Sequence, residues 1–310
     1  MAVGLFQRIG IAMLYKDALC GKKTFWSAGT TRLKTKRKSD RIDRNYSFLP
    51  IVFVIVAAST SCIPGEPLAE VLDRLVDLEY TSTELVISER GVILPTQIAD
   101  QHEAVVQLRR SLRRIIPISI FFDVEPADPE YPTVPAYIEY IEQFTLACRL
   151  AKDCKIVVIT VHAALPGTSY NDEVRHLAKL VEIGMYHGVI VGIATEAGRI
   201  TDTPETVGSL CKHVKGLGVT LDPSHYIYNL PKPKDFEAIL PHVCHVRLRD
   251  TTQKQFQTRV GQGVVEFGKL VDRLNQVEYR RALCVDLAPL PDVDQHAELR
   301  KMRLLSESLL

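Results

Sequence analysis

The sequence lacks an excess of charge of either sign. Its 38 lysine and arginine residues face 37 aspartate and glutamate residues, and the formal net charge is +1. Binding to nucleic acid or to a membrane surface is usually supported by a strongly basic chain, so we expect neither partner. With 46% hydrophobic and 24% charged residues, the 310-residue chain has the composition of a globular protein with enough apolar material for one large core.

The sequence also lacks paired cysteines. Its seven cysteines are odd in number and scattered, and none of them forms a C-x-x-C motif. This pattern argues against both a disulfide framework and a zinc knuckle. We therefore expect a cytoplasmic protein, in a compartment that keeps thiols reduced.

The amino-terminal segment is basic and shows no sustained helix or strand period. We predict a disordered basic leader over residues 1–47 and a single barrel domain over residues 48–310. A signal peptide is the alternative, because residues 48–58 form an apolar stretch of suitable length that is followed by small residues. The same stretch is far too short to span a bilayer, and residues 51–58 are also typical of a buried parallel strand.

From residue 51 onward, apolar strands alternate with amphipathic helices, which predicts a parallel sheet covered by helices. The predicted strands are 51–58, 84–88, 115–122, 156–162, 189–196, 219–222, 243–248 and 282–287. The predicted helices are 66–78, 97–113, 136–152, 171–186, one that starts at Thr203-Pro204, 236–240, 267–274 and 295–309. A proline-rich loop at 125–135 is long enough to be a lid. Eight such units favour the α/β class and a closed (β/α)8 TIM barrel.

Polar side chains follow the later strands. Asp222 and His225 come after an apolar strand with the spacing D-x-x-H, and a carboxylate and an imidazole in one short turn suit a divalent metal. Glu196, His245 and Asp286 lie at or near the ends of neighbouring strands. In a barrel these side chains share one mouth, so we expect them to converge on one ion.

Each of these residues also has an ordinary structural interpretation. Asp222 could cap the following turn, and His225 could be a surface histidine. Glu196 could pair with Arg199, His245 could be an inward histidine with its hydrogen bonds satisfied, and Asp286 could cap a turn before Pro289. The sequence leaves these alternatives open.

Several motifs together resemble the xylose isomerase-like barrels, a group that includes sugar phosphate isomerases and epimerases, hydroxypyruvate isomerase and endonuclease IV. The motifs are the glutamate of VGIATE, the D-x-x-H of LDPSHY, the histidine and final aspartate of HVRLRD, and RVGQGVVEFGKL, which is similar to an R-x-G-x-G loop. The resemblance covers residue 51 to the end. It implies that Glu196, Asp222 and His245 bind a metal and that His225 and Arg259 face the substrate.

The fourth position departs from the family pattern, because Asp286 stands where the epimerases usually have a glutamate. We expect Asp286 to be both the fourth ligand and a partner of Glu196 in proton transfer. The resemblance thus implies one divalent ion (Mn, Co, Mg or Zn) and the isomerisation or epimerisation of a small sugar, sugar phosphate or hydroxy-ketone through an enediolate. His162, at the end of the fourth strand, is expected to line the pocket. The sequence leaves open whether the protein forms a homo-oligomer.

Two other functions remain as alternatives. The first is a barrel that binds a sugar or a metal without turnover, for which the shortened Asp286 is the argument. The second is a nuclease similar to endonuclease IV, which needs additional histidines close after the seventh strand. Residues 250–263 contain no histidine, and no basic groove is evident outside the leader.

Overall fold

The computed structural model describes residues 54–310 except 101–105, 107 and 126–134. The predicted leader, its boundary with the barrel at residue 48, and nearly all of the predicted lid at 125–135 lie outside the described residues. The account below concerns the unit that begins at Val52 and continues to Leu310.

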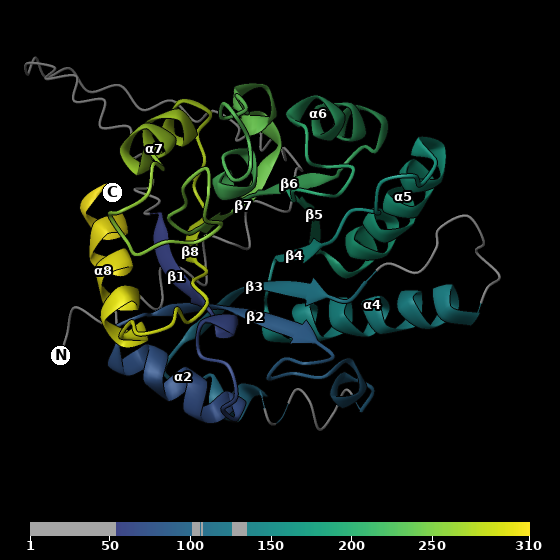
Figure 1. Cartoon of the computed structure of the whole chain (residues 1–310). Helices are drawn as coiled ribbons and strands as arrows, with labels where there is room; N and C mark the ends of the chain where they lie inside the picture. The colour runs from purple at the N-terminus through teal and green to yellow at the C-terminus, as the bar shows by residue number, and fades with distance from the viewer. Residues whose placement is uncertain (1–53, 101–105, 107, 126–134) are drawn as a thin grey trace, which may run out of the picture. The chain divides into compact units, whose positions relative to one another are not determined.

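Eight parallel strands close into a barrel in chain order, and β1 pairs with both β2 and β8 (Figure 1). The strands are β1 (Ile55–Ser59), β2 (Ser82–Ser88), β3 (Ile116–Asp123), β4 (Val158–Val161), β5 (Ile190–Ala194), β6 (Gly218–Leu221), β7 (Val243–Leu248) and β8 (Ala282–Val285). Every one of them overlaps a predicted strand. The prediction of a closed (β/α)8 barrel is therefore confirmed.

Helices flank the barrel on its outer side (Figure 1). They are α2 (Leu68–Asp77), α4 (Pro135–Cys154), α5 (Tyr170–His187), α6 (Pro204–His213), α7 (Phe267–Gln276) and α8 (Gln295–Ser308). The predicted start of α6 is correct: the Thr203 side chain accepts a hydrogen bond from the Thr206 backbone N–H, and Pro204 occupies the first turn. Among the described residues, no helix combines the length and the apolar character needed to cross a membrane.

Two predicted helices differ from the structure. Within 97–113, the start belongs to the short 3-10 helix η2 (Pro95–Ile98), and part of the remainder lies outside the described residues. The helix predicted at 236–240 is instead the 3-10 helix η4 (Glu237–His242). Pro241 explains the second difference, because a proline disfavours the α-helical conformation of the residue before it.

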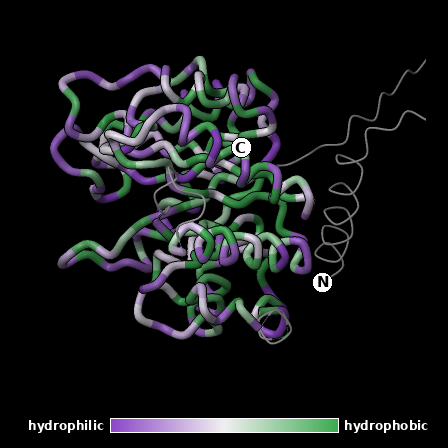
Figure 2. Tube along the Cα trace, turned by 90° about the vertical axis from the view of Figure 1, so that its right-hand side faces the viewer, coloured by the Kyte–Doolittle hydropathy of each residue, from purple (hydrophilic) through white to green (hydrophobic). Residues whose placement is uncertain are grey.

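The large apolar core lies between the outer face of the strands and the helices. Leu85 and Ile87 of β2 belong to this core together with Val71 and Leu72 of α2, and all four are at most 1% exposed. Figure 2 shows hydrophobic segments concentrated towards the middle of the described unit. Because successive strand residues point to opposite faces, Glu84 of β2 faces the barrel interior.

The barrel interior is polar over much of its length. Its inward side chains include Glu84, Ser119, Thr160, Thr220 and His245, and each of them is at most 1% exposed. The Thr160 and Thr220 hydroxyl oxygens lie 2.7 Å apart. Buried polar groups are costly unless they are hydrogen-bonded or paired, so this interior requires the network of contacts described next.

Candidate active site

The mouth of the barrel, formed by the carboxyl ends of its strands, collects most of the predicted site residues. His162 directly follows β4, Asp222 directly follows β6, and Asp286 directly follows β8. Glu196 lies shortly after β5. Parallel strands end on the same side of a barrel, which brings these residues together although they are far apart in the sequence.

His162 bridges two carboxylates. Its Nδ1 lies 2.8 Å from Glu196 Oε2, and its Nε2 lies 2.8 Å from Asp123 Oδ1. Carboxylates only accept hydrogen bonds, so both ring nitrogens donate, which requires the imidazolium form. Burial opposes that charge, but the hydrogen bonds to Asp123 and Glu196 raise the pKa of His162 to about 9. At neutral pH His162 is therefore a cation held between two anions.

Glu196 has a second cationic partner in Arg199, whose Nε lies 3.1 Å from Glu196 Oε2. The ion pair between Glu196 and Arg199, which the sequence left open as a structural alternative, is therefore present. Burial raises the pKa of Glu196, but the hydrogen bond and charge of His162 and the charge of Arg199 outweigh burial, so the pKa is lowered. Glu196 is consequently ionised and fixed in orientation.

We expect His162 to make the protein less stable in alkaline solution. Its pKa rises from 6.5 unfolded to about 9 folded, so its stabilisation is fully present below pH 6.5 and is lost as the pH rises through about 9. A shift of this size corresponds to roughly 3 kcal/mol. Thermal melts between pH 6.5 and 9.5 should show a steeper decline for wild type than for His162→Gln.

The control for that experiment is His242→Gln, which changes a histidine at the end of η4, outside the mouth. This variant should keep the wild-type pH dependence. If His162→Gln declines with pH as steeply as wild type, His162 is not the imidazolium that the two carboxylates require.

Asp222 caps the 3-10 helix η3 (Pro223–Tyr226), as its ordinary interpretation suggests, and in addition it binds an arginine. Its Oδ1 accepts hydrogen bonds from the Ser224 backbone N–H (3.0 Å) and hydroxyl (2.5 Å). Its Oδ2 accepts a hydrogen bond of 2.9 Å from Arg249 Nε. One oxygen of the Asp222 carboxylate thus caps η3, and the other binds Arg249 at the barrel mouth.

His225 lies beside Asp222 as a neutral imidazole. Its Nδ1 accepts a hydrogen bond from the Ala197 backbone N–H (3.0 Å), so the proton is on Nε2, which lies 3.8 Å from Asp222 Oδ2. Burial lowers the pKa of His225, and the attraction of Asp222 only partly offsets this effect. Phe256 packs against the imidazole, with ring centroids 4.6 Å apart, and Arg249 lies over the same phenyl ring.

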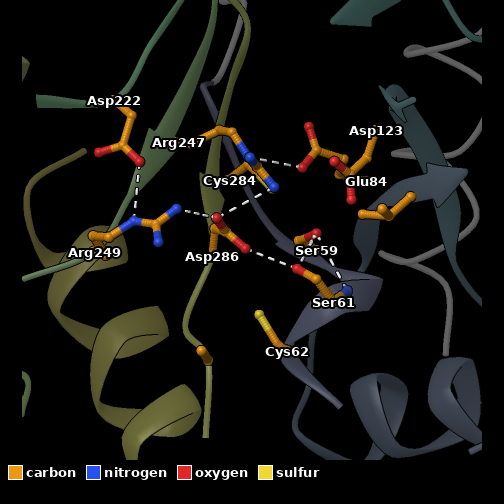
Figure 3. A network of polar contacts seen from close by, with 12 residues as sticks. Ser59, Ser61, Cys62, Glu84, Asp123, Asp222, Arg247, Arg249, Cys284 and Asp286 are labelled. Atoms are coloured by element: carbon orange, nitrogen blue, oxygen red, sulfur yellow. Dashed lines mark hydrogen bonds and ion pairs between the residues drawn. The ribbon is translucent and has the colours of Figure 1, made fainter. Parts of the chain in front are cut away.

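Arg247 on β7 and Arg249 just after this strand connect carboxylates from three other strands (Figure 3). Arg249 bonds to Asp222 and also, through Nη2, to Asp286 Oδ2. Arg247 Nη2 lies 3.2 Å from the same Asp286 oxygen, and Arg247 Nε lies 3.0 Å from Glu84 Oε1. The other Asp286 oxygen accepts a hydrogen bond of 2.7 Å from the Ser61 hydroxyl.

This network fixes the charges of its members. Burial raises the pKa of Asp286, but Arg247, Arg249 and the Ser61 hydrogen bond outweigh burial and lower the pKa to about 2. Burial likewise raises the pKa of Glu84, and Arg247 and His245 more than reverse the effect. Asp286 is therefore an anion at every physiological pH and is a poor proton donor.

His245 lies deeper in the barrel than the other predicted ligands. In the strand register it is level with Thr220, whereas Arg247 is level with Cys284. Two residues along a strand correspond to about 7 Å, so His245 is one inward layer below Arg247. Its Nε2 lies 2.8 Å from Glu84 Oε2 and 3.2 Å from the Ser119 hydroxyl, as expected for an inward histidine with its hydrogen bonds satisfied.

One group among the described residues could hold a metal ion: Glu84, His245 and Cys284 place one ligand atom each within 4.8 Å of one another. All three are buried. Burial raises the pKa of the Cys284 thiol well above its usual value, and the Glu84 charge adds to this effect. The Arg247 guanidinium is in contact with Glu84 in the same group.

Arg259, predicted to face the substrate, lies on the exposed side of the loop after β7. Its Nη2 donates to the Asp292 carbonyl (3.4 Å), and no hydrogen bond or ion pair joins it to the mouth in the described part of the chain. The loop itself is anchored by Asp250, whose Oδ2 accepts hydrogen bonds from the Gly261 and Gly263 backbone N–H groups (2.8 and 2.9 Å). A Cβ at Gly263 would lie 1.9 Å from Asp250 Oδ1, which explains this glycine of the R-x-G-x-G pattern.

The predicted metal ligands do not fit a divalent ion in this arrangement. Oxygens of Asp222 and Asp286 are bound by Arg249, and Glu196 is bound by His162 and Arg199. With an effective dielectric constant of about 20, a divalent ion about 4 Å from one guanidinium is repelled by about 8 kcal/mol. The ligand set of Glu196, Asp222, His245 and Asp286 stays a prediction, and no chemical step below uses an ion.

Several residues of the mouth network were not among the predicted site residues, among them Asp123, Glu84, Arg247 and Arg249. A signal for two of them is present in HVRLRD, where His245, Arg247 and Arg249 alternate with apolar residues and so share one face of a strand. Asp123 also ends an apolar strand. For Glu84, which begins a predicted strand, the sequence carries no comparable signal.

Comparison with known protein families gives one match, in which residues 72–302 fit the model described as xylose isomerase-like TIM barrel. A comparison with curated proteins gives no match in sequence.

Many solved structures resemble the chain. A D-allulose 3-epimerase from Methylomonas sp. in complex with D-allulose has a TM-score of 0.66 and 14% identity, and the match covers 83% of this chain and 98% of that chain. A D-psicose 3-epimerase with D-tagatose from Clostridium cellulolyticum H10 has a TM-score of 0.65 and 11% identity, covering 83% and 99%. A 3-keto-D-glucoside 4-epimerase from E. coli has a TM-score of 0.65 and 10% identity, covering 82% and 99%. At sequence identities this low, the similarity demonstrates that the chain has the same fold as these proteins.

Proposed function

The chain belongs to the xylose isomerase-like TIM barrel family, and we propose that it is an isomerase or epimerase of a small sugar or hydroxy-ketone. The observation that carries the proposal is the mouth itself, where the ionised Glu196 shares one end of the barrel with the guanidinium groups of Arg247 and Arg249. A base and a cationic centre at one site are what proton transfer next to a carbonyl group requires.

The proposed reaction is a balanced proton shift. Glu196 takes the proton from the hydroxyl-bearing carbon next to the substrate carbonyl. The electron pair of that C–H bond forms a C=C bond, and the π pair of the carbonyl moves onto its oxygen to give an enediolate. The hydroxyl proton then passes to the former carbonyl oxygen and the deprotonated oxygen forms the new carbonyl, while the C=C pair takes the proton back from Glu196 at the former carbonyl carbon, which completes an isomerisation without any oxidant. His162, held by Glu196 and Asp123, keeps the carboxylate in position.

Isomerisation has more support than epimerisation. Epimerisation needs a second group that delivers a proton to the opposite face, and Asp286 is the predicted candidate. Its pKa of about 2 and its contacts with Arg247 and Arg249 make it a poor donor of protons. We therefore assign proton transfer to Glu196 and assign to Asp286 the positioning of the two arginines.

The proposed substrate class follows from the side chains at the mouth and from the ligands of similar solved structures. Structural neighbours are described with D-allulose and with D-tagatose bound, which favours a ketose. A sugar phosphate has less support, because Arg259 is directed to the Asp292 carbonyl. Ketoses and hydroxy-ketones without phosphate are therefore the first substrates to test.

The deciding experiment is solvent deuterium exchange into a panel of ketoses and their phosphates, followed by NMR. We expect exchange at the carbon next to the carbonyl of at least one neutral ketose. Exchange into none of the sugars, with or without added Mn, Co, Mg or Zn, would reject the enzyme. It would leave the second candidate, a sugar-binding barrel without turnover, which the complete pairing of the mouth carboxylates favours.

A further inference from the structure

The mouth carries two permanent positive charges at the place where the sequence predicts a divalent ion. Arg249 joins Asp222 to Asp286, and Arg247 joins Asp286 to Glu84 (Figure 3). The two guanidinium groups together have the formal charge of one divalent ion. They neutralise carboxylates that come from three different strands, which is the task that a bound cation would otherwise perform.

Both arginines are held firmly. Their side chains are only 10% and 11% exposed. Burial lowers the pKa of an arginine, yet Asp286 and Glu84 raise that of Arg247, and Asp222 and Asp286 raise that of Arg249. Neither arginine can release its proton to make room for a metal ion, because the guanidinium pKa is far above any physiological pH.

The two arginines also keep hydrogen-bond donors for a ligand. Arg247 Nε is buried and has no hydrogen-bond partner of good geometry, although it is in ion-pair contact with Glu84. Within the described residues, neither Nη1 of Arg247 nor Nη1 of Arg249 donates a hydrogen bond. A buried donor left unsatisfied is costly, and the planar guanidinium matches an oxyanion well.

We infer that Arg247 and Arg249 take the place of the divalent ion, so that this barrel holds no resident metal at its mouth and binds the carbonyl or enediolate oxygen of its substrate through guanidinium N–H groups. The identity of that oxyanion rests on the proposed function. The replacement of the ion does not, because it follows from the contacts of the two arginines with Asp222, Asp286 and Glu84.

The first test measures metal binding by the full chain. Protein dialysed against a chelator is incubated with Mn²⁺ or Zn²⁺, passed through a desalting column and analysed for metal. We expect less than one metal ion per chain. An ion that binds the folded protein would raise the melting temperature as its concentration increases, so we expect no such rise with Mn²⁺. Stoichiometric retention of either ion would overturn the inference, including retention by Glu84, His245 and Cys284.

The second test removes one guanidinium. Arg249→Gln frees Asp222 Oδ2, leaves Asp286 Oδ2 in contact with Arg247 alone and removes a repulsive charge, so Mn²⁺ affinity should rise on the order of a hundredfold. The matched control is Arg303→Gln on α8, because Arg303 is 9% exposed and pairs with Glu79 and Glu307. If affinity is unchanged in Arg249→Gln, or rises equally in Arg303→Gln, the inference fails. If Arg249→Gln does not fold, the wild-type measurement decides.

Deuterium exchange in metal-free buffer separates this inference from the proposed function. Exchange by the chelator-treated wild type would support both. Exchange that appears only after an ion is added would keep the isomerase and overturn the inference. A chain that exchanges no sugar and binds no ion, but gains Mn²⁺ affinity in Arg249→Gln, would reject the isomerase while supporting the replacement of the ion.

Discussion

Replacement of Glu196 by glutamine is expected to lower the rate of deuterium exchange into the substrate on the order of a hundredfold to ten-thousandfold. That is the usual contribution of a positioned general base. The amide cannot accept a proton at neutral pH, but it retains an oxygen that can accept hydrogen bonds from His162 or Arg199. The fold should therefore persist, which the melting temperature of Glu196→Gln would establish.

The matched control is Glu125→Gln. Glu125 is the other carboxylate partner of Arg199, at 2.6 Å, but its side chain is 68% exposed. Its loss removes an ion pair without removing the proposed base, so exchange should stay within a few-fold of wild type. Equal rates in Glu196→Gln and wild type would show that Glu196 is not the base.

Asp286→Asn is expected to be the most destabilising of the mouth substitutions. It removes the anion that Arg247 and Arg249 share, so that two buried guanidinium groups keep only one carboxylate each, Glu84 for Arg247 and Asp222 for Arg249. Loss of one partner from a buried ion pair typically costs about 3–5 kcal/mol. Urea unfolding should show this loss as a lower midpoint with an unchanged slope, and exchange should be lost together with the orientation of the arginines.

The control for this substitution is Asp235→Asn, since Asp235 pairs with Arg273 at 3.4 Å but is 70% exposed. Exposed pairs contribute about 0–1 kcal/mol, so this variant should unfold close to wild type. A third variant, Asp286→Glu, keeps the charge and should recover much of the stability that Asp286→Asn loses. If Asp286→Asn is as stable as Asp235→Asn, Asp286 does not hold the two arginines.

The elements of the barrel could be predicted because they depend on local sequence. Each strand is a short apolar segment between polar turns, and each predicted strand from 51–58 to 282–287 overlaps an observed one. The exception at η4 also has a local cause in Pro241. The residues that follow the strands were predicted on the same basis, and parallel closure brings His162, Glu196, Asp222 and Asp286 to one mouth.

The partners of those residues could not be predicted, because they are set by register and depth. Asp286 meets Ser61, which lies 225 positions away in the chain, and His245 meets Glu84, which lies 161 positions away. His245 lies one inward layer below Arg247, and this depth depends on how β7 is aligned with β6 and β8.

The sequence by itself determined the fold class, the order of its strands and the end of the barrel at which polar residues collect, because hydrophobic periodicity and turn residues act locally. Only the tertiary structure decided what neutralises those carboxylates. Barrel closure places Arg247 and Arg249 between Asp222, Asp286 and Glu84. Buried carboxylates require a nearby positive charge, and in this chain two arginine side chains supply it.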